Sequence, residues 1–215
     1  MSVVFIAGAT GFMGQRLSVE LLRRGHTIRG LVRPGSEKRL APGCEGVTGN
    51  PLDASSYQRH IAGADTFVHL VGVAHPSPSK AAQFRTIDLR SANESLSAAA
   101  GAGIRHFVYV SVAHPAPVMR EYIAARTEAE ESIRSAGLNA TILRPWYVLG
   151  PGRRWPLLLL PAYWILGALP GTRETARRLG LVTIDQMVGT MSNAIDHPPS
   201  GLRVLEVPQI RSKSI

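Results

Sequence analysis

Cysteine is nearly absent from this chain of 215 residues, because Cys44 stands alone and has no second thiol for an internal disulfide. The chain also lacks the basic and then apolar stretch of a secretory leader, since Val3 to Ala7 already have the pattern of a strand. Together these two absences predict a cytoplasmic protein. A hydrophobic content of 45% is enough to bury one core, so we expect a single domain over residues 1–215.

Lysine and acidic residues are also few. The chain has three lysines beside 21 arginines, only 15 aspartates and glutamates, and a formal net charge of +9. The cations are scattered rather than gathered on one helix, and no base-stacking or groove-entry motif accompanies them. The charge therefore predicts an anionic small-molecule ligand, and nucleic acid is not an expected partner.

One long apolar stretch, Trp155 to Leu169, is too short to cross a bilayer, which takes about 18 or more apolar residues. A lid over a substrate pocket and a face of a homodimer both account for it. Contact with a membrane surface is a third interpretation, because arginines flank the stretch on both sides, namely Arg153, Arg154, Arg173, Arg177 and Arg178. We do not expect it, because Pro156 and Pro161 interrupt any amphipathic helix.

The glycine-rich segment Gly8-Ala9-Thr10-Gly11-Phe12-Met13-Gly14 follows the apolar run Val3 to Ala7 and precedes leucines at helical spacing. This is the order strand, glycine turn, helix. Glycines at such a turn let the backbone approach a pyrophosphate, whose charge is met by the amide groups and the positive dipole end of the helix. The segment predicts a dinucleotide site.

Strand-like and helix-like patterns then alternate along the chain. The expected strands are Val3–Ala7, His26–Val32, Cys44–Thr48, Thr66–Val71, His106–Val110, Leu138–Leu143 and Val204–Val207. Strict alternation predicts an α/β fold, a doubly wound parallel sheet of the Rossmann type, with the ligand at the carboxyl ends of the strands. Between the third and fourth strands we expect a helix over Ala54–Ala62, with Asp53 as its N-cap.

The second strand ends without a carboxylate. An NAD site places Asp or Glu there for the adenosine ribose, whereas an NADP site needs cations for the 2′-phosphate. No acid stands between Glu20 and Glu37, and the nearby cations are Arg29, Arg33, Lys38 and Arg39. NADP is therefore the expected cofactor and NAD the less favoured one, with Arg33 as the phosphate ligand. The alternative is that a strand-end arginine is simply solvated.

At these residues the sequence resembles the short-chain dehydrogenase/reductase superfamily, with the spacing GxxGxxG of its atypical, NmrA-like and epimerase/dehydratase-like members. The resemblance implies a reduced C-terminal substrate portion, a lid or substrate-side segment at residues 145–180. It also implies a set of cofactor-binding residues: Gly8, Thr10, Gly11, Phe12, Met13, Gly14, Arg33, Asn50, Leu52, Leu70, Val71, Gly72, Tyr122, Arg126, Pro145 and Trp146. Asn50 is a departure, because relatives usually have an aspartate that accepts from the adenine amino group.

The resemblance extends to the catalytic set, as Ser111, Tyr122 and Arg126. In the family the Tyr hydroxyl exchanges a proton with the substrate oxygen, Ser polarises that oxygen, and a Lys binds the nicotinamide ribose and lowers the Tyr pKa. Here Arg126 replaces the Lys, four residues after Tyr122 and so on the same helix face. Tyr122 as a packed aromatic and Arg126 as a surface charge is the alternative interpretation.

Two functions follow. The first is an NADP(H)-dependent oxidoreductase acting on a small carbonyl or related substrate, with Tyr122 as acid/base. The second is a non-catalytic NAD(P)(H)-binding protein, similar to NmrA-like redox sensors or to the nucleotide-binding accessory subunit of respiratory complex I. No metal site is expected, because no metal-ligand spacing is present, and His69 is interpreted as a satisfied buried histidine within its strand.

Overall fold

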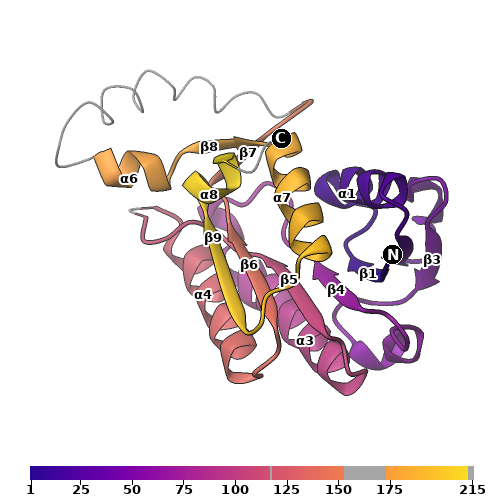
Figure 1. Cartoon of the computed structure of the whole chain (residues 1–215). Helices are drawn as coiled ribbons and strands as arrows, with labels where there is room; N and C mark the ends of the chain where they lie inside the picture. Colours follow the sequence, from indigo (N-terminus) through magenta and orange to yellow (C-terminus); the bar gives the residue numbers. More distant parts are fainter. Residues whose placement is uncertain (117, 153–172, 213–215) are drawn as a thin grey trace.

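The computed structural model describes residues 1–116, 118–152 and 173–212. In this part of the chain seven parallel strands form one sheet in the order β3-β2-β1-β4-β5-β6-β9 (Figure 1). Their bounds are β1 Val3–Ala7, β2 Thr27–Val32, β3 Glu45–Thr48, β4 Thr66–His69, β5 His106–Val110, β6 Ala140–Arg144 and β9 Leu202–Glu206. The doubly wound Rossmann-type sheet expected from the sequence is confirmed.

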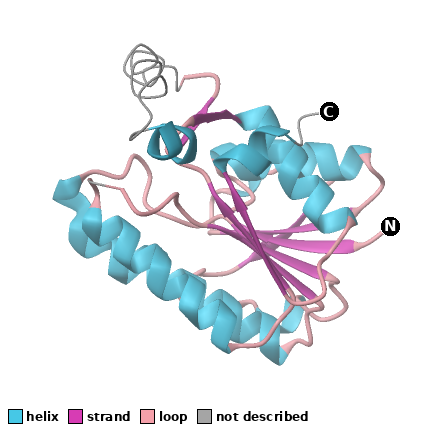
Figure 2. Ribbon diagram, turned by 60° about the vertical axis from the view of Figure 1, so that its left-hand side comes forward, coloured by secondary structure: helices cyan, strands magenta, loops and turns pink. Residues whose placement is uncertain are grey.

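Helices cover both faces of this sheet (Figure 2). Side chains alternate across each strand, so Phe5 of β1 packs on one face and Val4 and Ile6 pack on the other. The Phe5 face carries α3 Arg90–Gly101 and α4 Arg120–Ser135, and the opposite face carries α1 Phe12–Arg23, α7 Ile184–Asp196 and α8 Val207–Ser212. Two apolar cores result, one on each side of the sheet.

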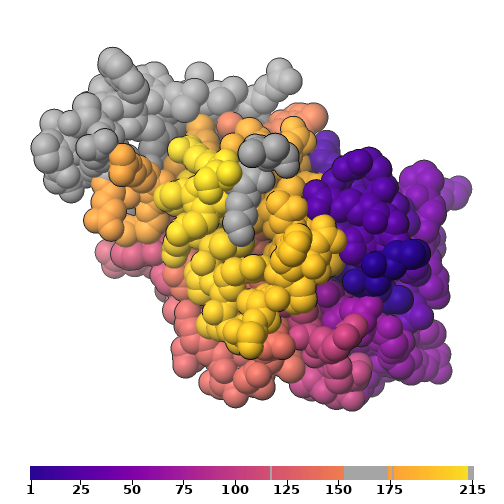
Figure 3. Space-filling view, in the orientation of Figure 1, coloured from indigo at the N-terminus to yellow at the C-terminus, as the bar shows by residue number. Residues whose placement is uncertain are grey.

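Two helices far apart in the sequence, α1 and α7, lie side by side on one face of the sheet (Figure 3). Arg24, just after α1, donates to Asp196 at 2.7 Å, and His26 Nε2 lies 2.9 Å from the other oxygen of that carboxylate. Helix α7 thus packs beside α1, and the two helices together cover one face of the sheet.

The expected helix over 54–62 is wrong. Two short 3-10 helices stand there, η2 Ala54–Ser56 and η3 Gln58–His60. Serine hydroxyls compete with helical hydrogen bonds, since Ser56 Oγ accepts from the Asn50 N–H at 2.9 Å and donates to the Asp53 carbonyl at 2.7 Å. Asp53 still caps, accepting from the Ser55 N–H.

The chain between β4 and β5 is one nearly continuous helical region. After η4 Pro78–Lys80 come α2 Ala81–Gln83, a π-helical stretch η5 Phe84–Leu89, and α3. The π-helical turns place Asp88 against the sheet, where its side chain has no exposed surface. Such turns mark functional sites in many proteins.

The remaining elements of the described chain are short. They are η1 Glu37–Arg39 after β2, the two-stranded pair β7 Tyr147–Leu149 and β8 Leu181–Thr183, and α6 Arg173–Arg178. Most of the expected lid over 145–180, including the apolar stretch Trp155 to Leu169, lies outside the described residues. Within the described ranges, no helix has both the length and the apolar character needed to cross a membrane.

Candidate dinucleotide site

A cleft of about 590 Å³ opens at the carboxyl ends of β1, β2 and β4. Many of the predicted cofactor residues line it: Gly8, Thr10, Gly11, Arg33, Asn50, Leu52, Leu70, Val71 and Gly72. Others line it without having been predicted as ligands: Leu31, Arg39, Pro51, Val73, Ala74, Lys80, Gln83 and Ile87. The cleft therefore lies where the glycine turn and the parallel sheet place a dinucleotide.

The glycine turn has the geometry of a close approach. Gly8 has φ +93°, and a Cβ there would lie 2.9 Å from the Leu70 carbonyl carbon, so only glycine fits between β1 and β4. Gly14 lies inside α1, where a Cβ would overlap the carbonyl oxygen of Gly8. Gly14 thus lets the helix pack on the turn, and it does not line the cleft.

Helix α1 presents its N-terminus at the cleft. Its N-cap Gly11 makes no side-chain cap, and its first turn contains no acidic residue. The amide groups at a helix N-terminus and the positive end of its dipole favour an anion, and α1 places them beside the cleft.

Cations supply all the charge of the described cleft lining, through Arg33, Arg39 and Lys80. Arg39 Nη2 donates to the Thr10 carbonyl at 3.1 Å, so this arginine bridges the segment after β2 to the glycine turn. Lys80 Nζ donates to the Ala74 and His75 carbonyls at 2.6 and 3.1 Å. An anionic dinucleotide fits this lining.

Arg29 does not belong to the cleft, although it stands among the cations that the sequence places there. Its guanidinium donates to the carbonyls of His60 and Ala62 and pairs with Glu45 at 3.4 Å. It ties the η3 region to β2. Asn50 does line the cleft, and its Oδ1 accepts from the Leu52 N–H at 3.1 Å, which leaves a second lone pair on that oxygen for an adenine amino group.

Tyr122 and Arg126 share one face of α4, as the four-residue spacing predicts. The Arg126 guanidinium carbon lies 5.2 Å from the Tyr122 ring centre, and Phe84 packs edge-on against the same ring, with the ring centres 5.0 Å apart. Tyr122 is half-buried, whereas Arg126 is only 6% exposed. Neither residue lines the cleft itself.

Arg126 directs both terminal nitrogens at partners within the protein, whereas its buried Nε has no hydrogen-bond partner among the described residues. Nη2 donates to Asp88 Oδ1 at 2.6 Å, and Nη1 donates to the Val110 carbonyl at 2.9 Å and to the Tyr109 hydroxyl at 3.3 Å. Burial raises the pKa of Tyr109 to about 12, so this phenol is neutral. Contact of Arg126 with a nicotinamide ribose stays a prediction.

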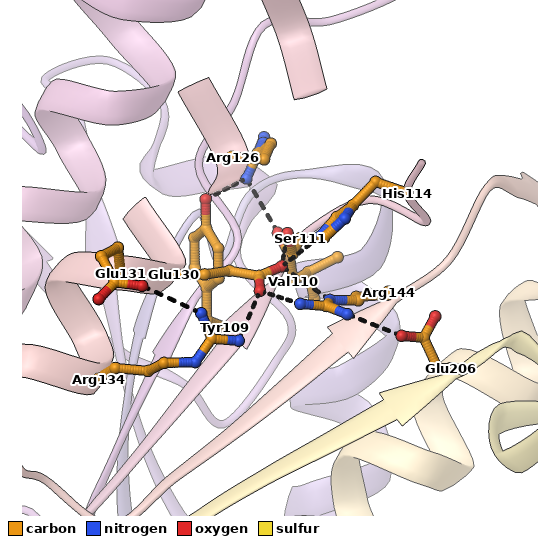
Figure 4. A network of polar contacts seen from close by, with 10 residues as sticks. All are labelled: Tyr109, Val110, Ser111, His114, Arg126, Glu130, Glu131, Arg134, Arg144 and Glu206. Carbon is orange, nitrogen blue, oxygen red and sulfur yellow. Dashed lines mark hydrogen bonds and ion pairs between the residues drawn. The ribbon is translucent and has the colours of Figure 1, made fainter. Parts of the chain in front are cut away.

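Ser111 directs its hydroxyl at Glu130 in α4, with Oγ 2.5 Å from Oε1 (Figure 4). Glu130 has no exposed surface and also pairs with Arg144, Arg134 and His114. Burial raises the pKa of the Glu130 carboxyl, but the neighbouring donors His114, Arg144 and Ser111 lower it to about 2. Polarisation of a substrate oxygen by Ser111 stays a prediction. It requires the Ser111 hydroxyl to break its hydrogen bond to Glu130 and donate to the substrate instead.

The remaining predicted cofactor residues, Phe12, Met13, Pro145 and Trp146, do not line the cleft. The Phe12 ring lies under the Arg16 guanidinium at 4.5 Å, and Trp146 packs edge-on against Tyr147. The Pro145 carbonyl accepts from the Ala113 N–H at 2.9 Å, which joins the segments that follow β5 and β6. Their cofactor contacts remain predictions.

His69 is a satisfied core histidine, as the sequence predicts. Its Nδ1 lies 3.0 Å from Ser95 Oγ and its Nε2 lies 3.5 Å from Ser91 Oγ, with no exposed surface. Burial lowers its pKa to about 3, so the ring is neutral.

With the cleft in place, the decisive comparison is a family model described as NAD(P)H-binding, which matches residues 8–153. The chain belongs to this NAD(P)H-binding family. The resemblance to atypical short-chain dehydrogenase/reductases is thereby confirmed, and the family contains oxidoreductase-like and epimerase-like proteins.

Two curated proteins illustrate the family. The chain is 31% identical over 177 residues to the ceramide reductase of Caulobacter vibrioides, which covers 81% of this chain and 55% of that protein. It is 34% identical over 156 residues to the uncharacterized sugar epimerase YhfK of Bacillus subtilis, covering 66% of this chain and 70% of that one. The chain thus spans about half the length of the ceramide reductase.

Solved structures of NAD(P)H-binding proteins have the same fold. WbmH of Bordetella bronchiseptica, crystallised with NAD+, superimposes with a TM-score of 0.71 at 21% identity, over 94% of this chain and 74% of WbmH. WbmG of the same organism, also crystallised with NAD, superimposes with a TM-score of 0.69 at 17% identity, over 95% of this chain and 72% of WbmG.

Proposed function

We propose that this protein is an NADP(H)-dependent oxidoreductase that acts on the carbonyl group of a small molecule or on a related substrate. The observation that carries the proposal is the cleft at the glycine turn, whose described charged lining residues are Arg33, Arg39 and Lys80. Named relatives support hydride chemistry, since one is a ceramide reductase and another a ketoreductase of Stigmatella aurantiaca, 25% identical over 168 residues.

NADP is preferred over NAD because of the side chains that follow β2. Arg33 and Arg39 both line the cleft there, and Arg39 is anchored to the Thr10 carbonyl. A 2′-phosphate needs charge-assisted donors, whereas a 2′-hydroxyl needs a carboxylate acceptor. The described lining offers the former and not the latter.

In the reaction, bound NADPH would supply a hydride to the substrate carbon. Tyr122, which is half-buried near the start of α4, would give its phenolic proton to the substrate oxygen. This step needs the Tyr122 hydroxyl to be within reach of the substrate. Arg126 lies beside this side chain, with its guanidinium carbon 5.2 Å from the ring centre. Ser111 would polarise the same oxygen once its hydroxyl has turned from Glu130 towards the substrate.

A non-catalytic NAD(P)(H)-binding protein is the second candidate. It is favoured by the bonds of two of the three predicted catalytic residues: Arg126 is held by Asp88, Tyr109 and Val110, and Ser111 is held by Glu130. The cofactor would then report redox state or stabilise the fold.

One experiment separates the two candidates. NADPH oxidation is followed at 340 nm with a broad panel of aldehydes and ketones, and NADPH affinity is measured by fluorescence titration on the same preparation. Turnover with any carbonyl supports the oxidoreductase. Tight NADPH binding without turnover on the whole panel would replace it by the binding protein.

A further inference from the structure

The ion pair between Arg126 and Asp88 lies directly beneath the segment that leaves β4. Asp88 Oδ1 accepts from Arg126, and its other oxygen, Oδ2, accepts from the Val73 N–H at 3.0 Å. Val73 and Gly72 line the cleft, whereas Asp88 has no exposed surface. One buried carboxylate therefore connects the floor of the cleft to the helix that carries Tyr122.

Gly72 completes this arrangement. A Cβ at residue 72 would overlap Nη2 of Arg126 and lie 3.1 Å from Asp88 Oδ1. Gly72 is not among the glycines with positive φ, so its backbone would accept alanine. Glycine is therefore needed at position 72 because the ion pair beneath it leaves no room for a side chain, and not because of the backbone conformation.

We propose that Asp88 and Arg126 act together as positioning residues, which hold the Gly72–Val73 segment in the shape that receives the cofactor half on the β4 side of the glycine turn. Arg126 is then a support beneath the cleft, and its charge is neutralised by Asp88. The proposal rests on the proposed cofactor site but not on turnover.

The two partners depend on each other because both are buried. Removing either one leaves the other as an unpaired charge out of reach of water, which costs far more than removing both. Asn at position 88 would still accept the Val73 N–H through its amide oxygen. The effects of Asp88→Asn and Arg126→Met on cofactor affinity are therefore expected to be strongly non-additive.

The first test starts from Gly72. Gly72→Ala should push Arg126 off Asp88 and weaken NADPH binding by about tenfold or more, the equivalent of one charged hydrogen bond. The same substitution in an Arg126→Met background has room for the methyl group and should add little further loss. Gly189→Ala, on α7 where a Cβ would meet nothing within 4 Å, is the matched control and should leave the affinity unchanged.

A second ligand separates positioning from general loss of fold. Adenosine 2′,5′-bisphosphate occupies only the β2 side of the cleft, so its affinity for Gly72→Ala and Arg126→Met should stay within about twofold of the parent value while that of NADPH falls. Equal loss of both ligands, or NADPH affinity unchanged in Gly72→Ala, would overturn the proposal.

NADPH affinity is also measured for Asp88→Asn, Arg126→Met and the double variant. These three affinities test the positioning proposal even if Gly72→Ala does not fold. The double variant should bind NADPH better than Arg126→Met alone. If it binds equally or more weakly, Arg126 contacts the cofactor directly and the positioning proposal fails. Absence of carbonyl turnover in the parent would remove the oxidoreductase function and leave these affinity measurements decisive.

Discussion

Ser111 donates its hydroxyl to Glu130 across 2.5 Å, from the end of β5 to the buried face of α4 (Figure 4). The same carboxylate receives Arg144, which extends to Glu206 of β9 at 2.8 Å. A side chain with no exposed surface thus joins two neighbouring strand ends and one helix.

Glu130→Gln is expected to destabilise the fold by about 3 kcal/mol at pH 7, because it leaves Arg144, whose side chain is only 13% exposed, without the counter-charge of Glu130. Urea denaturation measures the free energy of unfolding. Glu131→Gln is the control, since Glu131 is 70% exposed and its pair with Arg134 contributes little. A loss below about 1 kcal/mol in Glu130→Gln would contradict the central role of this carboxylate.

The contribution of Glu130 should also depend on pH. Its pKa is about 2 in the folded protein, below the ordinary 4.5, so the stabilisation is fully present above pH 4.5 and is lost as the pH falls towards 2. The stability difference between parent and Glu130→Gln should therefore shrink over this window. A difference that stays constant down to pH 3 would show that the charge of Glu130 is not the cause.

Buried histidines should make the protein less stable in mild acid. His69 has a folded pKa of about 3, below 6.5, so the unfolded chain takes up a proton first and stability falls as the pH drops below 6.5. Between pH 7 and pH 5 this residue alone should cost about 2 kcal/mol. His69→Asn should reduce the fall in unfolding free energy between pH 7 and pH 5 by that amount, and an unchanged fall would contradict a neutral His69.

Arg33→Ala should remove most of the preference for NADPH over NADH. A charge-assisted bond to the 2′-phosphate contributes roughly 1.5 to 3 kcal/mol, so NADPH should bind about tenfold or more weakly while NADH is little changed. Fluorescence titration of both cofactors gives the ratio. Arg29→Ala is the matched control, because Arg29 bonds to His60 and Ala62 outside the cleft. Equal affinities of the parent for the two cofactors would remove the basis of this prediction.

Tyr122→Phe should leave NADPH affinity nearly unchanged and lower kcat by about a hundredfold to ten-thousandfold, the usual contribution of a general acid. The ring stays packed against Phe84, so only the hydroxyl group is lost. Tyr57→Phe, whose hydroxyl lies 3.5 Å from Ser95 inside the core, is the control. Undiminished turnover in Tyr122→Phe would exclude this residue as the acid.

Local patterns were sufficient for the sheet and for the glycine turn. The strand His106–Val110 is observed with the expected bounds, because its short apolar run follows closely on the helix-ending glycines Gly101 and Gly103. The glycine turn follows from backbone sterics: Gly8 and Gly14 sit where any side chain would overlap the chain. The shared face of Tyr122 and Arg126 follows from helical spacing alone.

Tertiary structure decided the partners of the charged and polar side chains. The sequence places Arg29 and Arg33 near the same strand end, yet Arg29 points to the carbonyls after η3 and Arg33 lines the cleft. No pattern in the sequence singles out Asp88 or Glu130. Arg126 is 38 residues from Asp88, and Ser111 and Arg144 are 19 and 14 residues from Glu130 along the chain. Burial gives these groups their importance, since a charge removed from water must find a partner in space wherever the fold brings one.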